Sequence, residues 1–193
     1  DESLLGFSRM YRVTNRTVDL NIISEINDFL FNLANNHQTY QEIMAFLNQK
    51  INKKARPAWV DVFCSAIAGG CFAVVLGGGV KEFVAALLGS FLSMAFLKAM
   101  SAFKPSSFWS TTMAGGIICA VTLGCKALAP DTSMELTIAG GIMPYLPGMA
   151  FTHGLRDYIA GDLISGNSRV GEAVFLVGGL VIGIATVLGI FYH

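Results

Sequence analysis

Five long apolar runs follow one another along the chain after residue 57. They occupy residues 58–78, 83–102, 108–128, 134–155 and 170–191. A helix needs about 20 predominantly apolar residues to cross a bilayer, and each run is close to that length. The pattern therefore predicts an all-α polytopic membrane protein, with five transmembrane helices in a domain over residues 58–193.

The first 57 residues have a mixed pattern that is typical of a soluble segment. Residues 4–13 alternate apolar and polar side chains over part of their length, which predicts a strand. An apolar stripe predicts a helix over 19–36, and the capping box Thr39–Glu42 starts a second helix. We expect residues 1–57 to form a small α+β segment that is incomplete, because the sequence opens on Asp1 and so short a segment closes no core of its own.

Composition agrees with this division. Only 13% of the residues are charged, 53% are hydrophobic and the mean hydropathy is +0.58, whereas soluble domains carry about 25% charged residues. Zero net charge without a basic patch argues against a nucleic-acid partner. The four cysteines lie in apolar runs without a CxxC pair, so we interpret them as buried helix residues and predict no metal site.

The chain also lacks a phosphate-binding loop. Gly77-Gly78-Gly79 is followed by Val80-Lys81, which does not match the GxxxxGK[ST] pattern. We therefore expect no ATP-driven pumping by this chain, and no cofactor.

Lysine and arginine positions predict the orientation. Four of them lie just before the first run, at residues 50–56, and two lie in each of the second and fourth connections, whereas the first and third connections have one each, Lys81 and Lys126. The positive-inside rule then places the soluble N-terminal segment in the cytoplasm and the C-terminus outside the plasma membrane.

Small residues recur at four-residue spacing in three of the runs. The rows are Ala85-Gly89-Ser93, Gly116-Ala120-Gly124 and Gly179-Gly183. Such rows let helices approach closely in lipid. Packing within one bundle and contact with another subunit both explain them.

The fourth run is interrupted in its middle by Pro144, Pro147 and Gly148. Prolines remove backbone hydrogen bonds and break or kink a helix. Broken membrane helices occur where the freed groups face protein or water, and transporters build substrate sites on them. A kink that serves only packing is the alternative.

Six ionisable residues follow this interruption within twenty positions. Those at i, i+4 share a helix face, and those at i, i+3 can pair. Charges at membrane depth mark pathways or proton relays, whereas in an interfacial loop they are ordinary solvated residues; both interpretations stay open. The six are His153, Arg156, Asp157, Asp162, Arg169 and Glu172.

The same segment carries a spaced series of short motifs. They are Pro147-Gly148, Gly154, Arg156-Asp157, Gly161-Asp162, Ser165-Gly166, Arg169 and Glu172-Ala173. This series resembles the signature of the threonine/serine exporter family, and the resemblance extends over nearly the whole chain. One departure is that a family asparagine after the PG pair is Thr152 or His153 here.

The resemblance implies secondary export of threonine and serine, or of succinate in a related branch, driven by the proton gradient or the membrane potential. It implies a separate companion subunit of five spans, and we expect a higher oligomer in the lipid bilayer. Asp157 and Asp162 would be proton or substrate-ammonium partners, and Arg156 or Arg169 would attract the substrate carboxylate. The predicted pathway comprises Pro147, Gly148, His153, Arg156, Asp157, Asp162, Arg169 and Glu172.

Two other classes of protein remain for comparison. A non-transporting scaffold, whose soluble head recruits a cytoplasmic protein, would leave the charged residues dispensable. A membrane enzyme would need a nucleophile and a base, for which Ser165 and His153 qualify only by residue type. We predict a transporter subunit and no enzyme.

Overall fold

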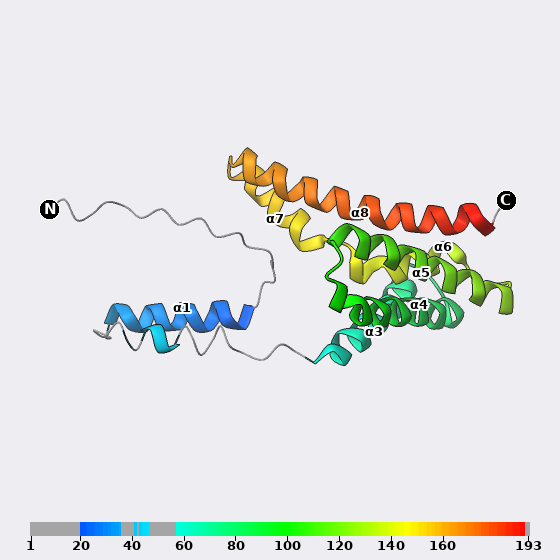
Figure 1. Cartoon of the computed structure of the whole chain (residues 1–193), viewed down its shortest axis with the longest axis horizontal. Helices are drawn as coiled ribbons and strands as arrows, with labels where there is room; N and C mark the ends of the chain where they lie inside the picture. The colour runs from blue at the N-terminus through cyan, green and yellow to red at the C-terminus, as the bar shows by residue number, and fades with distance from the viewer. Residues whose placement is uncertain (1–19, 36–40, 42, 47–56, 192–193) are drawn as a thin grey trace. The chain divides into compact units, whose positions relative to one another are not determined.

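The structure is a computed structural model that describes residues 20–35, 41, 43–46 and 57–191. The chain divides into two compact units, Asp1–Ala55 and Arg56–His193. The regular structure of the described residues is helical throughout (Figure 1). Whether the membrane part begins at residue 58, as the sequence predicts, stays a prediction.

The first unit contains the helix α1, Leu20–Asn35, which lies within the predicted range 19–36. Residues 41 and 43–46 are also helical, in the region of the second predicted helix. The rings of Phe29 and Phe46 stack at a centroid distance of 4.1 Å, so the two helical segments pack together. The predicted strand over 4–13 and most of the capping box lie outside the described residues.

Among the described residues, four helices of the second unit are long and apolar enough to cross a membrane. They match the first, second, third and fifth predicted runs, because an apolar stretch satisfies its backbone hydrogen bonds locally as a helix. The four are α3 (Ala58–Val75), α4 (Val80–Ala99) with a 3₁₀ turn over Met100–Phe103, α5 (Ser107–Leu128) and α8 (Leu163–Phe191).

The fourth predicted run is not one helix. It forms α6 (Met134–Ile142), the 3₁₀ turn η2 (Met143–Tyr145) and α7 (Gly148–Ile159). The interruption lies where Pro144 and Pro147 predict it, since neither proline donates a backbone hydrogen bond. Neither α6 nor α7 is long enough to span a membrane alone, so the structure supports four candidate spans and the count of five stays a prediction.

The last helix begins earlier than the sequence pattern indicates. We expected it at residue 170, but α8 starts at Leu163. The sequence pattern places its first turns in a connecting loop, because after Leu163 and Ile164 the next five residues are polar or glycine. Over 29 residues α8 is about 43 Å long, which exceeds the roughly 30 Å of a bilayer core.

Close backbone contact holds α5 against α8, and glycine makes it possible. A Cβ atom on Gly183 would overlap the Thr112 carbonyl oxygen and lie 2.8 Å from the Gly116 nitrogen. The row Gly179-Gly183 is therefore used inside this subunit, as is Ala85-Gly89-Ser93, which is buried. Gly124 of the third row is exposed and has nothing nearby, so contact with another molecule stays open there.

The cysteines are all helical, but they are not all buried. Cys119 is buried, Cys125 is half-buried, and Cys64 and Cys71 are exposed. The prediction of buried cysteines is wrong for the last two. They lie seven residues apart on one face of α3, while the buried residues of that helix follow a different face.

Candidate functional site

The interruption leaves the Gly141 carbonyl without its backbone partner, and this carbonyl accepts a hydrogen bond from a neighbouring helix instead. In a 3₁₀ turn the nitrogen of Pro144 would donate to the carbonyl of Gly141, but proline has no N–H. The hydroxyl of Ser90 on α4 donates to that carbonyl instead, at 2.9 Å. Ser90 is fully buried, so a side chain of one helix replaces the missing backbone bond of another.

A second hydrogen bond joins the interruption to Ser90, and in this one the donor is on η2 and the acceptor is on α4. The Tyr145 hydroxyl on η2 donates to the Ser90 carbonyl at 3.1 Å. Tyr145 Oη is also close enough to the hydroxyls of Ser65 and Ser93 to interact with them. Neither of those two Oγ atoms completes a hydrogen bond of good geometry, and both are buried.

The N-terminal end of α6, which lies away from the interruption, is held by the buried carboxylate of Glu82. Glu82 Oε2 accepts from the Gly79 nitrogen and Glu82 Oε1 from the Ser133 nitrogen, each at 2.8 Å. Glu82 therefore joins the start of α4 to the start of α6. Its residue exposure is 8%, and the sequence alone gave no reason to single it out.

Beyond the break, α7 and the first turns of α8 form a hairpin (Figure 1). The chain reverses at Gly161, whose φ of +85° is a conformation that favours glycine. The reversal brings residues of the two helices together, and the Tyr158 hydroxyl donates to Asn167 Oδ1 at 3.2 Å.

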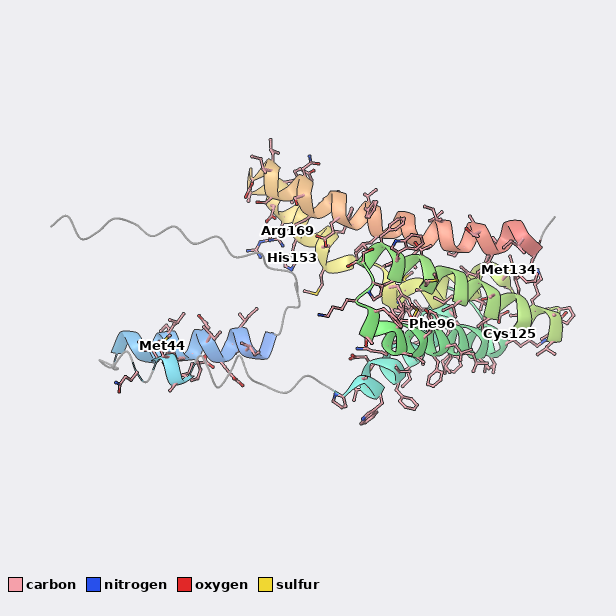
Figure 2. All side chains as sticks on the ribbon, in the orientation of Figure 1. Met44, Phe96, Cys125, Met134, His153 and Arg169 are labelled. Carbon is pink, nitrogen blue, oxygen red and sulfur yellow. The ribbon has the colours of Figure 1, made fainter. Side chains whose placement is uncertain are left out.

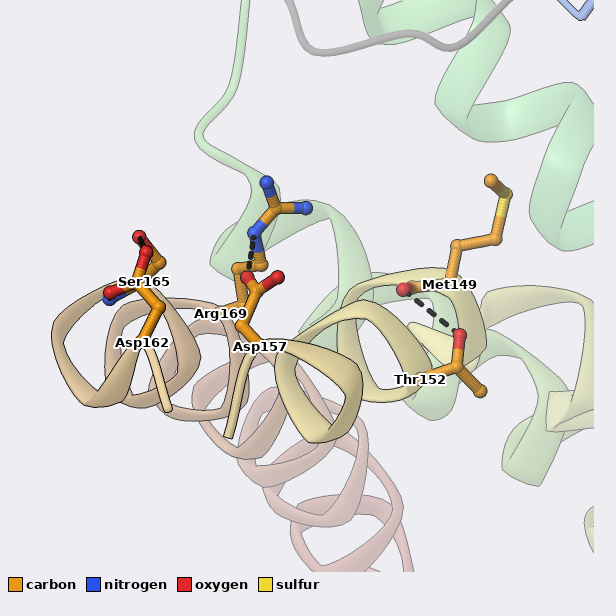
Figure 3. A network of polar contacts seen from close by, with 6 residues as sticks. All are labelled: Met149, Thr152, Asp157, Asp162, Ser165 and Arg169. Atoms are coloured by element: carbon orange, nitrogen blue, oxygen red, sulfur yellow. Dashed lines mark hydrogen bonds and ion pairs between the residues drawn. The ribbon is translucent and has the colours of Figure 1, made fainter. Parts of the chain in front are cut away.

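An ion pair crosses this hairpin. Arg169 Nε on α8 lies 3.0 Å from Asp157 Oδ2 on α7 (Figure 3). The Asp157 side chain is 26% exposed and that of Arg169 48% exposed. The Oδ2 atom is itself buried and completes no hydrogen bond, so the contact is a charge pair only.

Asp162 has a different environment. It precedes α8, and its Oδ1 accepts from the Ser165 nitrogen at 3.1 Å while its Oδ2 accepts from the Ser165 hydroxyl at 2.7 Å (Figure 3). These bonds cap the helix N-terminus. They also hold the pKa of Asp162 below its ordinary value of 3.8, the Ser165 hydroxyl making the largest contribution. α7 ends at Ile159, so the turn of the hairpin lies between Asp157 and Asp162.

The other predicted pathway residues lie along the same hairpin. Pro147 and Gly148 start α7, His153 is half-buried on it and Arg156 is exposed on it. Figure 2 places His153 and Arg169 at the same end of the second unit, away from Cys125 and Met134 at the other end. Glu172 is exposed on α8, and a pair between Arg169 and Glu172 stays a prediction.

Thr152, one of the two candidates for the family departure, makes only local hydrogen bonds. Its hydroxyl donates within α7 to the carbonyl of Gly148 at 3.0 Å and to that of Met149 at 3.1 Å, the second of which is drawn in Figure 3. Thr152 is exposed, and these bonds connect it to no other helix.

Sequence reasoning missed the serine and tyrosine hydroxyls at the break. Ser93 was noticed only as a small residue in a packing row, and Ser65, Ser90 and Tyr145 were not singled out. A signal was present, because polar hydroxyls inside apolar runs are candidates for contacts between helices. Within the described part of the chain, no group of three or more His, Cys, Asp or Glu side chains is placed to hold a metal.

The sequence is similar to those of two exporters. A threonine/serine exporter from Corynebacterium glutamicum is 29% identical over 123 residues, which cover 62% of this chain and 25% of the relative. A protein named "Probable threonine/serine exporter" from Mycobacterium tuberculosis (strain ATCC 25618 / H37Rv) is 26% identical over 128 residues, covering 66% and 24%. The matched region thus spans about a quarter of each relative. No solved structure matches the chain.

The family model named ThrE, for threonine/serine exporters, matches residues 3–191. That range includes the interrupted helix, the α7–α8 hairpin and all four candidate spans. The chain is a multi-pass membrane protein, and it belongs to the threonine/serine exporter family.

Proposed function

We propose that this chain is one subunit of a secondary exporter of threonine and serine. The family and the names of the two relatives support the substrate class. The observation that carries the proposal is the interruption between α6 and α7, which is packed against α4 rather than left as an exposed kink. Irregular backbone of this kind is typical of transporter substrate sites.

In this proposal α6, η2 and α7 together make the fourth of five crossings of the membrane. The soluble segment is cytoplasmic and the C-terminus is outside, as the lysine and arginine distribution predicts. Much of the surface of α8 is apolar and exposed on this chain, which supports a companion membrane subunit or an oligomer as well as lipid.

The Asp157–Arg169 pair is the proposed contact for the charged ends of the substrate. A free amino acid carries an ammonium and a carboxylate, and these match the two side chains with opposite sign. Because Asp157 Oδ2 completes no hydrogen bond, the charged groups of a substrate can replace the contact between Asp157 and Arg169, and only that one charge contact is lost. A proton on Asp157 or His153 would couple transport to the proton gradient.

The two aspartates have different roles in the proposal. Both carboxylate oxygens of Asp162 are occupied by Ser165 as a helix cap, which leaves this side chain less available to a substrate or a proton. The sequence-based proposal gave both aspartates a transport role, and we now assign that role to Asp157 alone.

The test is efflux of labelled threonine, serine and succinate from preloaded vesicles that contain the full-length protein, with and without the companion subunit. We expect Asp157→Asn to abolish threonine and serine efflux without lowering expression. Asp162→Asn is expected to retain efflux, because asparagine caps a helix about as well as aspartate. Glu135→Gln, at an exposed carboxylate on α6, is the matched control.

Normal efflux in Asp157→Asn would remove the ion pair from the pathway and favour a scaffold. Efflux of succinate but not of threonine would place the chain in the dicarboxylate branch.

A further inference from the structure

Three hydroxyl side chains from three different elements meet beside the helix interruption. Ser65 comes from α3, Ser93 from α4 and Tyr145 from η2. Ser65 is 5% exposed and Ser93 is fully buried. The three are called the hydroxyl cluster below.

Two members of the cluster have unsatisfied hydrogen-bonding groups. Ser65 Oγ and Ser93 Oγ complete no hydrogen bond of good geometry, although Tyr145 Oη is close to both, and Tyr145 already donates its proton to the Ser90 carbonyl. A buried hydroxyl without a partner costs about 1–3 kcal/mol. Within a bilayer core no bulk water is at hand to supply one.

Other buried hydroxyls in this bundle show how a serine or threonine is ordinarily satisfied in a helix. Thr122 Oγ1 donates to the Ile118 carbonyl and Thr137 Oγ1 to the Ser133 carbonyl, each at 2.8 Å. Both bonds run to the residue four positions earlier, the usual local partner. Ser65 and Ser93 do not use that partner, although both lie in helices.

We propose that the hydroxyl cluster binds the side-chain hydroxyl of the exported amino acid. This inference rests on the proposed function and adds a recognition site to it. Threonine and serine share one feature that alanine and valine lack, the β-hydroxyl. A hydroxyl can donate to one serine Oγ and accept from the other, which satisfies both buried groups at once.

Such a cluster also explains selection against similar amino acids. Valine has nearly the shape of threonine, so an apolar contact separates the two poorly. A site built to hydrogen-bond a hydroxyl rejects the analogue without it strongly, because the polar groups of the site are then left unpaired.

The cluster is closed in this structure, so substrate reaches it only when η2 moves away from α3 and α4. The interruption supplies the joint for that movement, and the two Ser90 hydrogen bonds, to Gly141 and from Tyr145, hold the closed position. Asp157 lies ten residues after Pro147 along α7, roughly 15 Å from the break, so the cluster and the Asp157–Arg169 pair would be two successive binding positions on the pathway, not contacts made at the same time.

The experiment measures binding and efflux of threonine and valine by full-length wild-type protein and by the variants Ser65→Ala and Ser93→Ala. Binding is followed by ligand-induced thermal stabilisation of the purified protein, and efflux from proteoliposomes. Each variant is expected to weaken the apparent threonine affinity about three- to tenfold, the value of one hydrogen bond, and to leave valine unchanged.

Ser110→Ala is the matched control. Its hydroxyl donates to the Ser106 carbonyl of its own helix region at 3.2 Å and is not part of the cluster. Each cluster variant removes only a weak contact with Tyr145 and no hydrogen bond of good geometry, so both are expected to remain monodisperse in size-exclusion chromatography. If one does not fold, the other still tests the proposal.

Equal changes in threonine and valine affinity, or no change in either, would overturn the cluster while wild-type efflux leaves the exporter intact. Wild-type protein that neither binds nor exports threonine and serine, with its companion present, would overturn both proposals.

Discussion

The contact between α5 and α8 allows a sharp test of how this bundle is held together. Gly183→Ala adds one methyl group at a point where the nearest atoms are backbone. The added Cβ would overlap the Thr112 carbonyl oxygen and lie 2.8 Å from the Gly116 nitrogen and 2.9 Å from the Thr112 carbonyl carbon. Real Cβ atoms are essentially never closer than 3.0 Å to such neighbours, so the two helices must separate along part of their length.

Gly178 in the same helix is the matched control, because a Cβ there has nothing within 4 Å. Both substitutions gain the same helix propensity, about 1 kcal/mol from glycine to alanine. That gain cancels in the comparison, and what remains is the cost of overpacking, about 1–3 kcal/mol. We therefore expect Gly183→Ala to be less stable than Gly178→Ala by about that amount.

The assay is equilibrium unfolding of the two purified variants in mild detergent titrated with a denaturing one, followed by circular dichroism. If Gly183→Ala is as stable as Gly178→Ala, then α5 and α8 do not approach as closely as the structure shows. The row Gly179-Gly183 would then be free to contact another subunit.

Two further predictions concern the break and the hairpin. Ser90→Ala removes the donor to the Gly141 carbonyl and should lower the free energy of unfolding by about 1–3 kcal/mol, measured in the same titration; a value equal to that of Ser110→Ala would contradict the bond. Asp162→Ala should remove an acid-dependent part of the stability. Because the folded pKa of Asp162 lies below the ordinary 3.8, its contribution is complete above that value and is lost as pH falls below it. The variant should show a flatter acid limb than wild type, and an unchanged limb would contradict the cap.

The apolar pattern was sufficient to locate the helices of the second unit. In an apolar run the backbone is satisfied only by bonds within the segment, so length and hydropathy predict a helix without knowledge of its neighbours. The interruption was predictable for a similar local reason, since Pro144 and Pro147 lack the N–H groups that a helix needs. The start of α8 was not, because its first turns are polar and are ordered by the Asp162 cap and by packing on α7.

The candidate site divides in the same way. The charged residues after the break stand out in the sequence because charge is rare in this chain. Their roles depended on the turn at Gly161, which separates Asp157 from Asp162 and turns Asp157 toward Arg169, twelve residues later in the sequence. No spacing rule for one helix pairs residues that far apart.

What the sequence determined by itself is the kind of protein: apolar helices, one broken helix and a cluster of charges beside the break. Those features follow from properties of single residues and of their near neighbours along the chain. Only the tertiary structure decided which side chains meet across helices. It brought Ser90 to the Gly141 carbonyl and left the hydroxyls of Ser65 and Ser93 buried without partners, because such contacts depend on how separate segments pack.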